Sequence, residues 1–481
     1  MKTLSLPLVS DDADFPQTAP ERTVNLFGAK VGKDQFILQG SPGLNLFGVL
    51  EGSGGIRGEL RFKGTDERLF AVRGNSFQEW DTGTSAFIER GLLSSLIGQV
   101  GMTYHQTTAG VKQVVVVDGT KAYKYIAGTP GSFAEIPAVD PDPAYGFQGG
   151  GAGLVYASLR ALSFTPGTGK IWCSDFDDIF RWKVIAGGVA ETFPDPIVAL
   201  ASVGAVIFVF GTDSMEPWVD QGLPTFPFRR IQAGSPVGCS APSSVSVYGQ
   251  AAYWLGGTKE GRGQVYRTNG YSPERISTDE IERIIGGMAS FDDAVGYIVQ
   301  EEGHVFYVLN FGVGDRTLVY DISTGLWAEW EYRNGDGTLS RHPAIAQAVY
   351  NGLNLVGDAR NGNIYEMAGK YLDNDGLLIV REKIFPCWPQ DSYEFTSMPP
   401  FFLALDVGTT PSGADEPRAM LSWSDDRGKL YGMEVTRGLG LTGRYDIRPV
   451  WDGLGSSYGR AYRLRLTGPV KFTIREAGFI Q

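Results

Sequence analysis

Apolar and polar positions alternate along most of the chain, and Gly, Asn or Asp interrupts the alternation every few residues. A period of two is typical of β-strands that bury one face. Between about residues 55 and 370 an apolar strand, a turn and a second strand with an aromatic residue near its end recur, which predicts a series of β-hairpins. The instances are LFAVRGNSFQEWD (69–81), VVVVDGTKAYKYI (114–126), IFVFGTDSMEPWVD (207–220), YWLGG with QVYRTNG (253–270), VFYVLN with RTLVYDISTGLWAEWEY (305–332) and NLVGDARNGNIYEM (354–367).

These hairpins must pack against one another, because a single hairpin is marginally stable in water. Their spacing is irregular and leaves room for three or four strands in each unit. A β-propeller of six blades fits this pattern and makes the chain an all-β protein. Successive β-sandwiches are the alternative, but they give no reason for a recurrent hairpin that ends in an aromatic residue.

The two ends of the chain differ from the repeated region. Residues 1–50 hold clusters of Pro, Asp and Gly, so we expect an extended arm or a strand that closes the propeller ring. Residues 51–370 are expected to form the propeller itself. From residue 371 to 481, segments such as AMLSWSDD and AYRLRLTG alternate cleanly, which predicts a separate C-terminal β platform or sandwich.

Composition agrees with this interpretation. Glycine accounts for 65 of the 481 residues and aromatic residues for 12%, which favours many short strands joined by tight turns. The three cysteines, Cys173, Cys239 and Cys387, lie far apart and predict neither a disulfide framework nor a zinc site. A formal net charge of −12 argues against a free-standing nucleic-acid binder. The short apolar stretch before Pro7 predicts neither a signal sequence nor a membrane span, so we expect synthesis in the cytoplasm and no stable membrane insertion.

Ser424–Tyr431, SDDRGKLY, is the segment that most resembles part of an enzyme. It fits the Asp box of sialidase-type propellers, in which Ser and Asp bond to the backbone of a turn and Gly takes a left-handed conformation. That role is structural even in enzymes, and there is one copy.

Two acidic groups come next, Asp175 with Asp177 and Asp178, and Asp292 with Asp293. A glycosidase needs two carboxylates at a defined separation in one cleft, and closeness in sequence does not supply that geometry. Turn formation is the more economical interpretation of both groups.

The remaining motifs are weaker. The segment 165–170, TPGTGK, lacks the first glycine and the Ser or Thr of a phosphate loop and predicts a turn. The segment 373–376, DNDG, lacks the further ligands of an EF-hand. His105, His304 and His342 are widely separated, and the tryptophans at hairpin ends favour core packing over stacking on sugars. The sequence therefore predicts no catalytic, cofactor-binding or metal-binding residue and no cofactor.

Pro236–Glu282 is the most informative stretch of the chain. It contains PVGCSAPSSVSVYGQAAYWLGG and QVYRTNGYSPERIST, which predict strands followed by a capped helix beginning near Ser277 or Thr278. With Gly55–Asp81, Thr317–Trp330, VGDARNGNIYEM and the C-terminal LSWSDDRGKLYG, RYDIRPVWDGLG and AYRLRLTGPVKFTIREA, this stretch resembles the tail hub or nozzle proteins of short-tailed bacteriophages, also called packaged-DNA stabilisation proteins.

The segments lie in the family's order and span nearly the whole chain, although residues 91–233 share little beyond their strand pattern. The resemblance implies a β-propeller with an added β platform, six copies in a ring below the portal and its adaptor, and a central channel for the genome. It also implies contacts with tail fibres or spikes and with a needle or plug, and a location in the virion tail. DNA would pass through the channel without specific binding.

Two hypotheses follow. The first is a structural virion protein, the tail nozzle, without enzymatic activity. The second is a phage-borne propeller that binds or depolymerises glycans, which requires a cleft with paired carboxylates at a propeller face.

Overall fold

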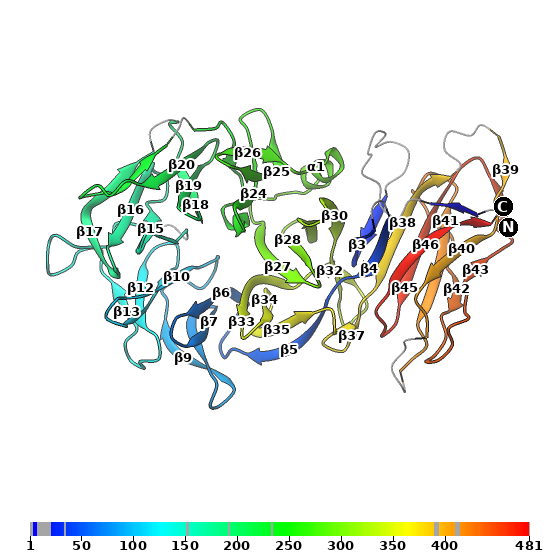
Figure 1. The fold of residues 1–481 in the computed structure, drawn as a ribbon, viewed down its shortest axis with the longest axis horizontal. Helices are drawn as coiled ribbons and strands as arrows, with labels where there is room; N and C mark the ends of the chain where they lie inside the picture. The colour runs from blue at the N-terminus through cyan, green and yellow to red at the C-terminus, as the bar shows by residue number, and fades with distance from the viewer. Residues whose placement is uncertain are drawn as a thin grey trace.

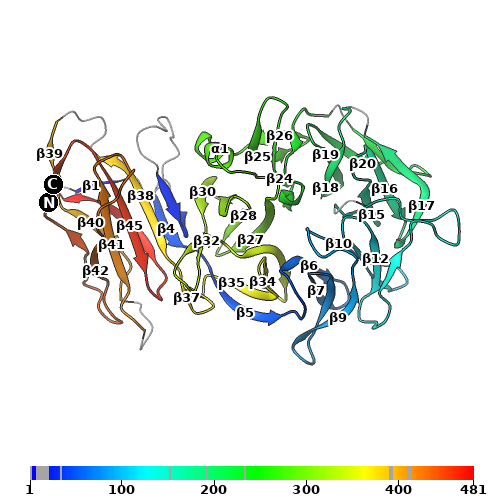
Figure 2. The ribbon, with the colours of Figure 1, turned by 180° about the vertical axis from the view of Figure 1, so that it is seen from behind.

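The computed structural model describes residues 3–6, 21–32, 35–150, 153–190, 193–231, 234–388, 394–408 and 414–480. The described chain is built almost entirely from β-strands, with one α-helix, α1 (Asp279–Gly286), and one 3₁₀ turn at Pro242–Ser244. A ring of small sheets occupies one end of an elongated molecule and a β-sandwich occupies the other (Figures 1 and 2). The prediction of an all-β propeller with an added C-terminal β domain is confirmed.

Seven antiparallel units follow one another around the ring in the described residues. The first four are β6 (Ile56–Lys63), β7 (Glu67–Arg73), β8 (Ser76–Asp81) and β9 (Ala86–Leu92); β10 (Gly101–Gln106), β11 (Lys112–Val117), β12 (Ala122–Ile126) and β13 (Ala134–Ile136); β14 (Val155–Ala157), β15 (Arg160–Phe164), β16 (Lys170–Asp175) and β17 (Asp178–Val189); and β18 (Ile197–Val203), β19 (Val206–Gly211), β20 (Met215–Asp220) and β21 (Phe228–Arg230). The fifth and sixth are β22 (Gly238–Cys239), β23 (Ser246–Tyr248), β24 (Ala251–Gly257), β25 (Arg262–Asn269) and β26 (Ser272–Arg275); and β27 (Val295–Glu301), β28 (His304–Phe311), β29 (Arg316–Asp321) and β30 (Leu326–Glu329).

The seventh unit combines distant parts of the chain. It contains β33 (Ala344–Tyr350), β34 (Leu353–Asp358) and β35 (Asn363–Ala368), and its outer strand is β5 (Gly43–Val49) from near the N-terminus. The short strands β36 (Asp373–Asn374) and β37 (Leu377–Leu378) extend this sheet. Neighbouring innermost strands lie against one another around the ring, and β33 lies against β6.

The predicted count of six blades is not confirmed, and the reason lies in the third unit. Each of the six hairpins in the sequence pattern supplies middle strands of one unit, such as β7 with β8 and β34 with β35. The third unit, 155–189, has no such signature, because its middle hairpin turns through TPGTG and its third strand runs into the acidic segment SDFDD. The turn predicted at 165–170 is present, with residues 165–169 between β15 and β16, which begins at Lys170.

Apolar side chains fill the spaces between units. Leu69, Ala71, Ile56 and Leu355 pack between the first unit and the seventh, while Trp254 and Phe210 pack between the fourth and the fifth. Trp182, Trp254 and Trp330 are almost fully buried. Core packing is therefore the role of these three tryptophans, as predicted.

Both ends of the chain build the sandwich. One sheet contains β3 (Leu26–Val31), β4 (Gln35–Gly40), β46 (Thr473–Ile480), β40 (Phe401–Leu405) and β43 (Val450–Trp451), with β1 (Thr3–Ser5) beside β46. The facing sheet contains β38 (Arg381–Trp388), β45 (Arg460–Thr467), β41 (Arg418–Ser424) and β42 (Val435–Gly438). Phe401, Tyr462, Phe479 and Trp451 stack in the core between them. Two small ribbons lie outside these sheets, β31 (Glu331–Arg333) with β32 (Leu339–Arg341) and β39 (Thr396–Ser397) with β44 (Ser456–Ser457).

An unpaired carboxyl group lies where the ring closes. Both carboxylate oxygens of Glu59, on β6, are buried and have no hydrogen-bond partner among the described residues. Gly357 of the seventh unit faces this side chain, and a Cβ there would lie 2.5 Å from Glu59 Oε1. Burial raises the pKa of Glu59 from 4.5 to about 8. The side chain is therefore held in its neutral form at pH 7.

The raised pKa of Glu59 predicts that the free energy of unfolding falls as pH rises, an effect that the Glu59→Gln variant lacks. Between pH 4.5 and about 8 the unfolded chain ionises at this position while the folded chain keeps its proton. The wild type should therefore lose free energy of unfolding relative to the variant by up to about 1.4 kcal/mol per pH unit as pH rises through this window. Urea unfolding of both proteins at several pH values measures the difference. Parallel stability curves for the two proteins would contradict the prediction.

Candidate functional site: the junction between propeller and sandwich

A three-residue strand lies between the two parts of the molecule and pairs with both. Strand β2 (Arg22–Val24) pairs in parallel with β30 of the sixth unit at Val24–Glu329 and antiparallel with β38 of the sandwich. The sheet therefore runs without interruption through nine strands, from β27 in the propeller to β42 at the far edge of the sandwich. Backbone hydrogen bonds across β2 bind the two parts into one sheet.

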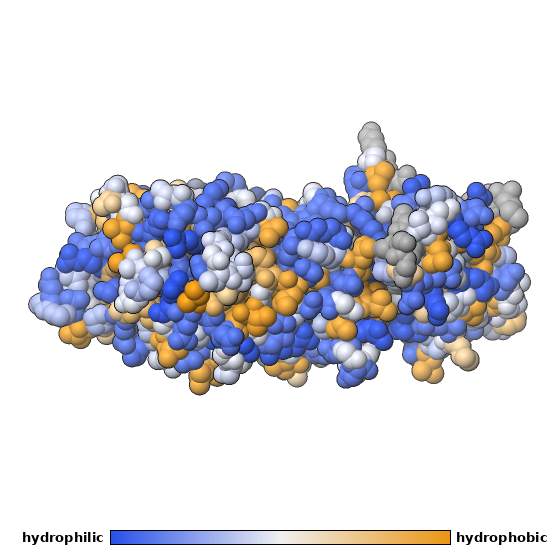
Figure 3. Space-filling model, turned by 90° about the horizontal axis from the view of Figure 1, so that it is seen from below, coloured by the Kyte–Doolittle hydropathy of each residue, from blue (hydrophilic) through white to orange (hydrophobic). Residues whose placement is uncertain are grey.

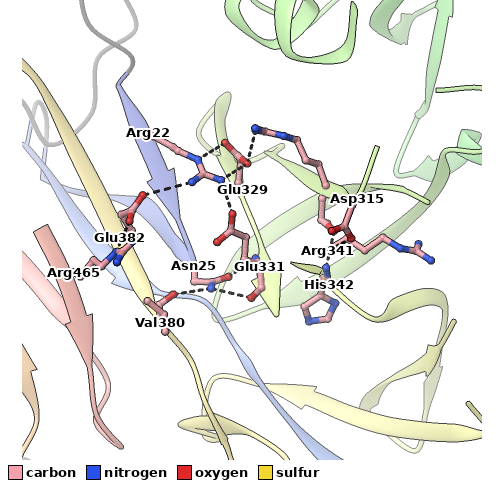
Figure 4. Close-up of polar contacts among 12 residues, drawn as sticks. Arg22, Asn25, Asp315, Glu329, Glu331, Arg341, His342, Val380, Glu382 and Arg465 are labelled. Atoms are coloured by element: carbon pink, nitrogen blue, oxygen red, sulfur yellow. Dashed lines mark hydrogen bonds and ion pairs between the residues drawn. The ribbon is translucent and has the colours of Figure 1, made fainter. Parts of the chain in front are cut away.

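Alternating charges cross this sheet beside β2 (Figure 4). Arg22 donates from Nε to Glu329 at 2.9 Å and from Nη2 to Glu331 at 2.5 Å, and its Nη1 lies 3.5 Å from Glu382. Glu382 accepts from Arg465 at 2.6 Å, and Arg465 also pairs with Glu434 at 3.0 Å. On the propeller side, Arg316 pairs with Glu329 at 3.1 Å. Because each interior member touches partners on both sides, the charges form a connected network from propeller to sandwich.

Asn25 closes the gap where β2 ends. Its Nδ2 donates to the carbonyl oxygens of Glu331 and Val380 at 2.9 and 2.8 Å, and its Oδ1 accepts from Glu331 N at 2.9 Å (Figure 4). The residue is buried and has φ = 53°, a left-handed conformation that Asn tolerates better than most residues. A single side chain thus satisfies backbone groups of β31 and of the segment that leads into β38.

Burial and neighbouring carboxylates have opposite effects on the pKa values of the basic side chains in this network. Burial on its own lowers the pKa of the Arg22 guanidinium, yet Glu329 and Glu331 outweigh it and hold this pKa above its ordinary value. The same balance raises the pKa of Arg465 beside Glu382. Burial lowers the pKa of Lys383, which is almost fully buried and contacts Glu21 and Thr23 on the neighbouring segment.

The first acidic group from the sequence serves to join two propeller units. Asp177 Oδ1 contacts His105 Nε2 at 2.7 Å, and Asp177 Oδ2 accepts from the Thr108 hydroxyl, across the boundary of the second and third units. Asp178 accepts from Gln113 on the same boundary at 2.8 Å, and Asp175 pairs with Lys183 at 2.7 Å. Each carboxylate therefore has a separate partner, and the three are not arranged as a pair across a cleft.

His105 has a second partner that makes the cluster resemble a catalytic triad. Tyr156 Oη lies 2.9 Å from His105 Nδ1, so Asp177, His105 and Tyr156 form a chain. The imidazole is 5% exposed, and burial raises the pKa of Tyr156, which keeps that phenol protonated. The chain is suited to fixing two strands, because its base is out of reach of a substrate.

The Asp-box segment has the geometry of its motif. Ser424 Oγ accepts from Gly428 N at 2.8 Å, and Asp426 Oδ1 accepts from Lys429 N and Leu430 N at 2.9 Å. Gly428 has φ = 86°. Asp425 turns away to pair with Arg460 at 2.7 Å. These side chains tie off the turn that follows β41, which is the structural role expected of them.

The other singled-out residues also have local partners. Asp293 accepts from Val313 N at 2.7 Å, Asp373 accepts from Gly376 N at 3.2 Å, and the Asp292 N–H donates to Ser290 Oγ at 3.4 Å. His304 pairs with Asp321 at 2.6 Å, while burial lowers the pKa of His342 to about 3. Among the described residues the three cysteines are free thiols, no group of three or more potential ligands is suited to a metal ion, and no helix is long and apolar enough to span a membrane.

A cavity of about 400 Å³ lies where the innermost strands of the ring converge. Its lining comes from all seven units and is largely apolar or glycine, including Gly58, Gly101, Leu154, Val198 and Gly296. Glu59 is the single acidic residue among those that line it in the described part of the chain. The cavity therefore does not provide the paired carboxylates that a glycosidase requires.

Sequence reasoning missed the junction entirely. Arg22 and Asn25 lie in a segment whose composition indicated an extended arm or a strand that closes the propeller ring, and their partners are about 300 residues away in sequence. The alternation in the segment ERTVN could have indicated a strand. No local signal identifies the two strands that pair with it.

Comparison with known proteins places this architecture among the structural proteins of bacteriophage tails that combine a propeller with a sandwich. The family described as "Bacteriophage P22 Gp10, beta-propeller" matches residues 6–371, and that described as "Bacteriophage P22 Gp10, beta-sandwich" matches residues 394–479. The chain belongs to this family of packaged-DNA stabilisation proteins. A search of curated proteins finds no match.

Solved structures similar to the chain are remote. The computationally designed Ika8 protein is 12% identical, with a TM-score of 0.39 over 67% of this chain and 99% of its own. The extracellular domain of the one-component system BT4673 from B. thetaiotaomicron is 10% identical, with a TM-score of 0.42 over 89% of this chain and 58% of its own. U3-55K is 9% identical, with a TM-score of 0.42 over 68% of this chain and 98% of its own.

Replacing Arg22 with Met should weaken the junction. Glu329, Glu331 and Glu382 would each lose a charged partner in a largely buried setting, and we expect a loss of about 2–3 kcal/mol in the free energy of unfolding. Urea unfolding measures that loss, and limited proteolysis should show faster cleavage between propeller and sandwich. Arg267→Met is the matched control, because Arg267 pairs with Glu274 on the propeller surface, where the two side chains are 36% and 41% exposed, and the change should cost less than about 1 kcal/mol. Equal losses in the two variants would exclude a special role for the junction.

Proposed function

We propose that this chain forms the tail nozzle of a short-tailed phage, as one of six copies in a ring that extends the DNA exit channel below the portal and its adaptor. In this role the ring closes the tail, retains packaged DNA and offers docking surfaces to fibres or spikes and to a needle or plug. The chain is made in the host cytoplasm and acts in the virion without catalysing a reaction.

The continuous sheet through β2 is the observation that carries this proposal. Membership of the family makes the protein a structural component of a phage tail. A channel wall under pressure from packaged DNA needs subunits that do not bend between their parts, and the nine-stranded sheet with its charge network supplies that stiffness. The formal charge of −12 suits a channel through which DNA slides without sticking.

The surface supports docking of other proteins. Apolar side chains emerge in several separate groups among hydrophilic ones on the face in Figure 3. Large apolar side chains are more than half exposed in loops at both ends of the molecule, among them Ile97, Val139, Leu430, Met433 and Tyr445. A glycan-degrading enzyme is the less favoured alternative, because Asp175, Asp177 and Asp178 each have structural partners and Glu59 is the single acidic residue among the described residues that line the central cavity.

Cryo-electron microscopy of purified virions tests the ring directly. We expect six copies around the exit channel between adaptor and tail tip, with both the propeller and the sandwich resolved. Density for this chain on peripheral fibres would overturn the proposal and would redirect attention to glycan hydrolysis.

Complementation tests the role of the junction in retaining DNA. Virions assembled with the Arg22→Met variant should release their genome more readily than the wild type, measured as DNA accessible to nuclease after mild heating. Virions with Arg267→Met should match the wild type. Circular dichroism of the purified variants shows whether each is folded, so that leakage is distinguished from failure to fold. Wild-type retention by a folded Arg22→Met protein would exclude the junction as the stiffening element.

A further inference from the structure

The ring closes at a seam between its first and seventh units, which come from the two ends of the propeller sequence. At the inner end of this seam β33 lies against β6, and Ile56, Ala348 and Leu355 pack between the two units. This end also borders the central cavity, since β6 and β33 both contribute to its lining. Among the described strands no backbone pairing joins β6 to β33, so side-chain packing holds the inner end together.

The outer end of the seam is fastened more firmly. Gln78 of the first unit donates from Nε2 to Glu51 O at 2.7 Å. Arg73 donates from Nη1 to Leu50 O at 2.6 Å, and Leu50 N donates to Gly362 O of the seventh unit at 2.8 Å. Movement at the seam is therefore expected at its inner end, with the outer end as the fixed side.

Glu59 places a carboxyl group inside the inner end. Its two oxygen atoms are buried without a hydrogen-bond partner among the described residues. Gly357 of the seventh unit leaves the space that this group fills, because a Cβ there would lie 2.5 Å from Glu59 Oε1. An ionised carboxylate in this position would lose its hydration without a compensating contact. The closed seam therefore accepts Glu59 in its protonated form.

The charged groups around Glu59 do not change this requirement. Alternation places Arg61, exposed Lys63, Glu67 and Arg73 on the same faces of β6 and β7, and Tyr350 faces them from β33, while β34 presents no titratable side chain on this side. Arg61 pairs with Glu67 at 2.8 Å, and Arg73 donates to backbone carbonyls. Burial is accordingly the influence that raises the pKa of Glu59.

The central cavity provides space into which the ionised side chain can turn. Glu59, Ala346 and Gln347 are among the residues that line it, and its volume of about 400 Å³ is enough for several water molecules. Lys, Arg and His do not occur among the described residues of the lining. Water would therefore solvate the carboxylate there.

We propose that the inner end of the seam is a proton-controlled latch, closed while Glu59 is protonated and opened when Glu59 ionises and turns toward the central cavity. The closed latch binds one proton more than the open latch, because the freed carboxyl group returns to its ordinary pKa of 4.5. The ratio of open to closed seams therefore rises about tenfold for each pH unit between pH 4.5 and about 8.

This opening differs from global unfolding, because the other seams of the ring keep their packing. It also does not depend on the nozzle role, since the latch belongs to the purified chain.

Thiol labelling tests the latch. Ala348 is 5% exposed in the seam, so Ala348→Cys places there a thiol that iodoacetamide reaches when the seam opens. Below pH 8 the thiolate fraction, and with it the intrinsic reactivity, rises about tenfold per pH unit. With Glu59 present, labelling of this cysteine should rise about 100-fold per pH unit between about pH 6 and 7.5, and in the Glu59→Gln background it should rise about tenfold. A labelling rate proportional to iodoacetamide concentration shows that opening is a rapid pre-equilibrium.

The native cysteine Cys239 is the internal control. It is 2% exposed and packs between the fourth and fifth units, so at pH 7.5 it should react at least about tenfold more slowly than the cysteine at position 348. Mass spectrometry assigns the label to each cysteine, and circular dichroism shows whether the variants fold. Ala346→Cys, on the same strand, is the second reporter if Ala348→Cys does not fold.

Two results would overturn the proposal. The first is an equal pH dependence of labelling at position 348 with Glu59 and with Gln in its place. The second is an equal labelling rate at position 348 and at Cys239, because global unfolding would then expose both thiols.

Discussion

The pairing of strand β2 with two sheets at once is the constraint on which the rest of the molecule depends. Its three residues pair with β38 of the sandwich on one side, and Val24 pairs with Glu329 of the propeller on the other, so the strand lies between the edges of both parts. Two sheets that meet edge to edge through a third strand resist bending within the plane of the sheet, because bending would break backbone hydrogen bonds. The ion pairs that Glu382 makes with Arg22 and Arg465 depend on this pairing, because the strands that carry the three side chains set the distances between them.

Local sequence predicted much of the propeller because hairpins are local. The strand pairs β7–β8, β11–β12 and β34–β35 were visible as alternation around a Gly or Asn turn, and each occupies the place that such a hairpin must take in a blade. The Asp box was equally visible, because its hydrogen bonds link residues within five positions of one another. The third unit was missed because Trp172 and Trp182 do not lie at the end of its middle hairpin, where the aromatic residues of the other six units lie.

What sequence could not predict is long-range pairing. Strands β3 and β4 lie at the start of the chain, yet their sheet partner β46 is at its end, and nothing in the alternation of LFGAKV or QFILQG specifies that neighbour. The same holds for Asn25, whose three hydrogen bonds reach residues 306 and 355 positions away. Buried polar networks of this kind depend on geometry that appears once the sheets are assembled.

The position of β3 and β4 has a consequence for how the protein reaches its native state during synthesis. These strands are made well before β46, which pairs with β4, and before β38, which pairs with β2. The propeller hairpins can form in order as they appear. Strands β3 and β4 can pair with each other early, but β4 must wait for β46, and β2 must wait for β38. Contacts of such high sequence separation slow folding and prolong the exposure of apolar strand edges. The completion of the sandwich, and with it the joining of the two parts into one sheet, is therefore a late step in the folding of each subunit.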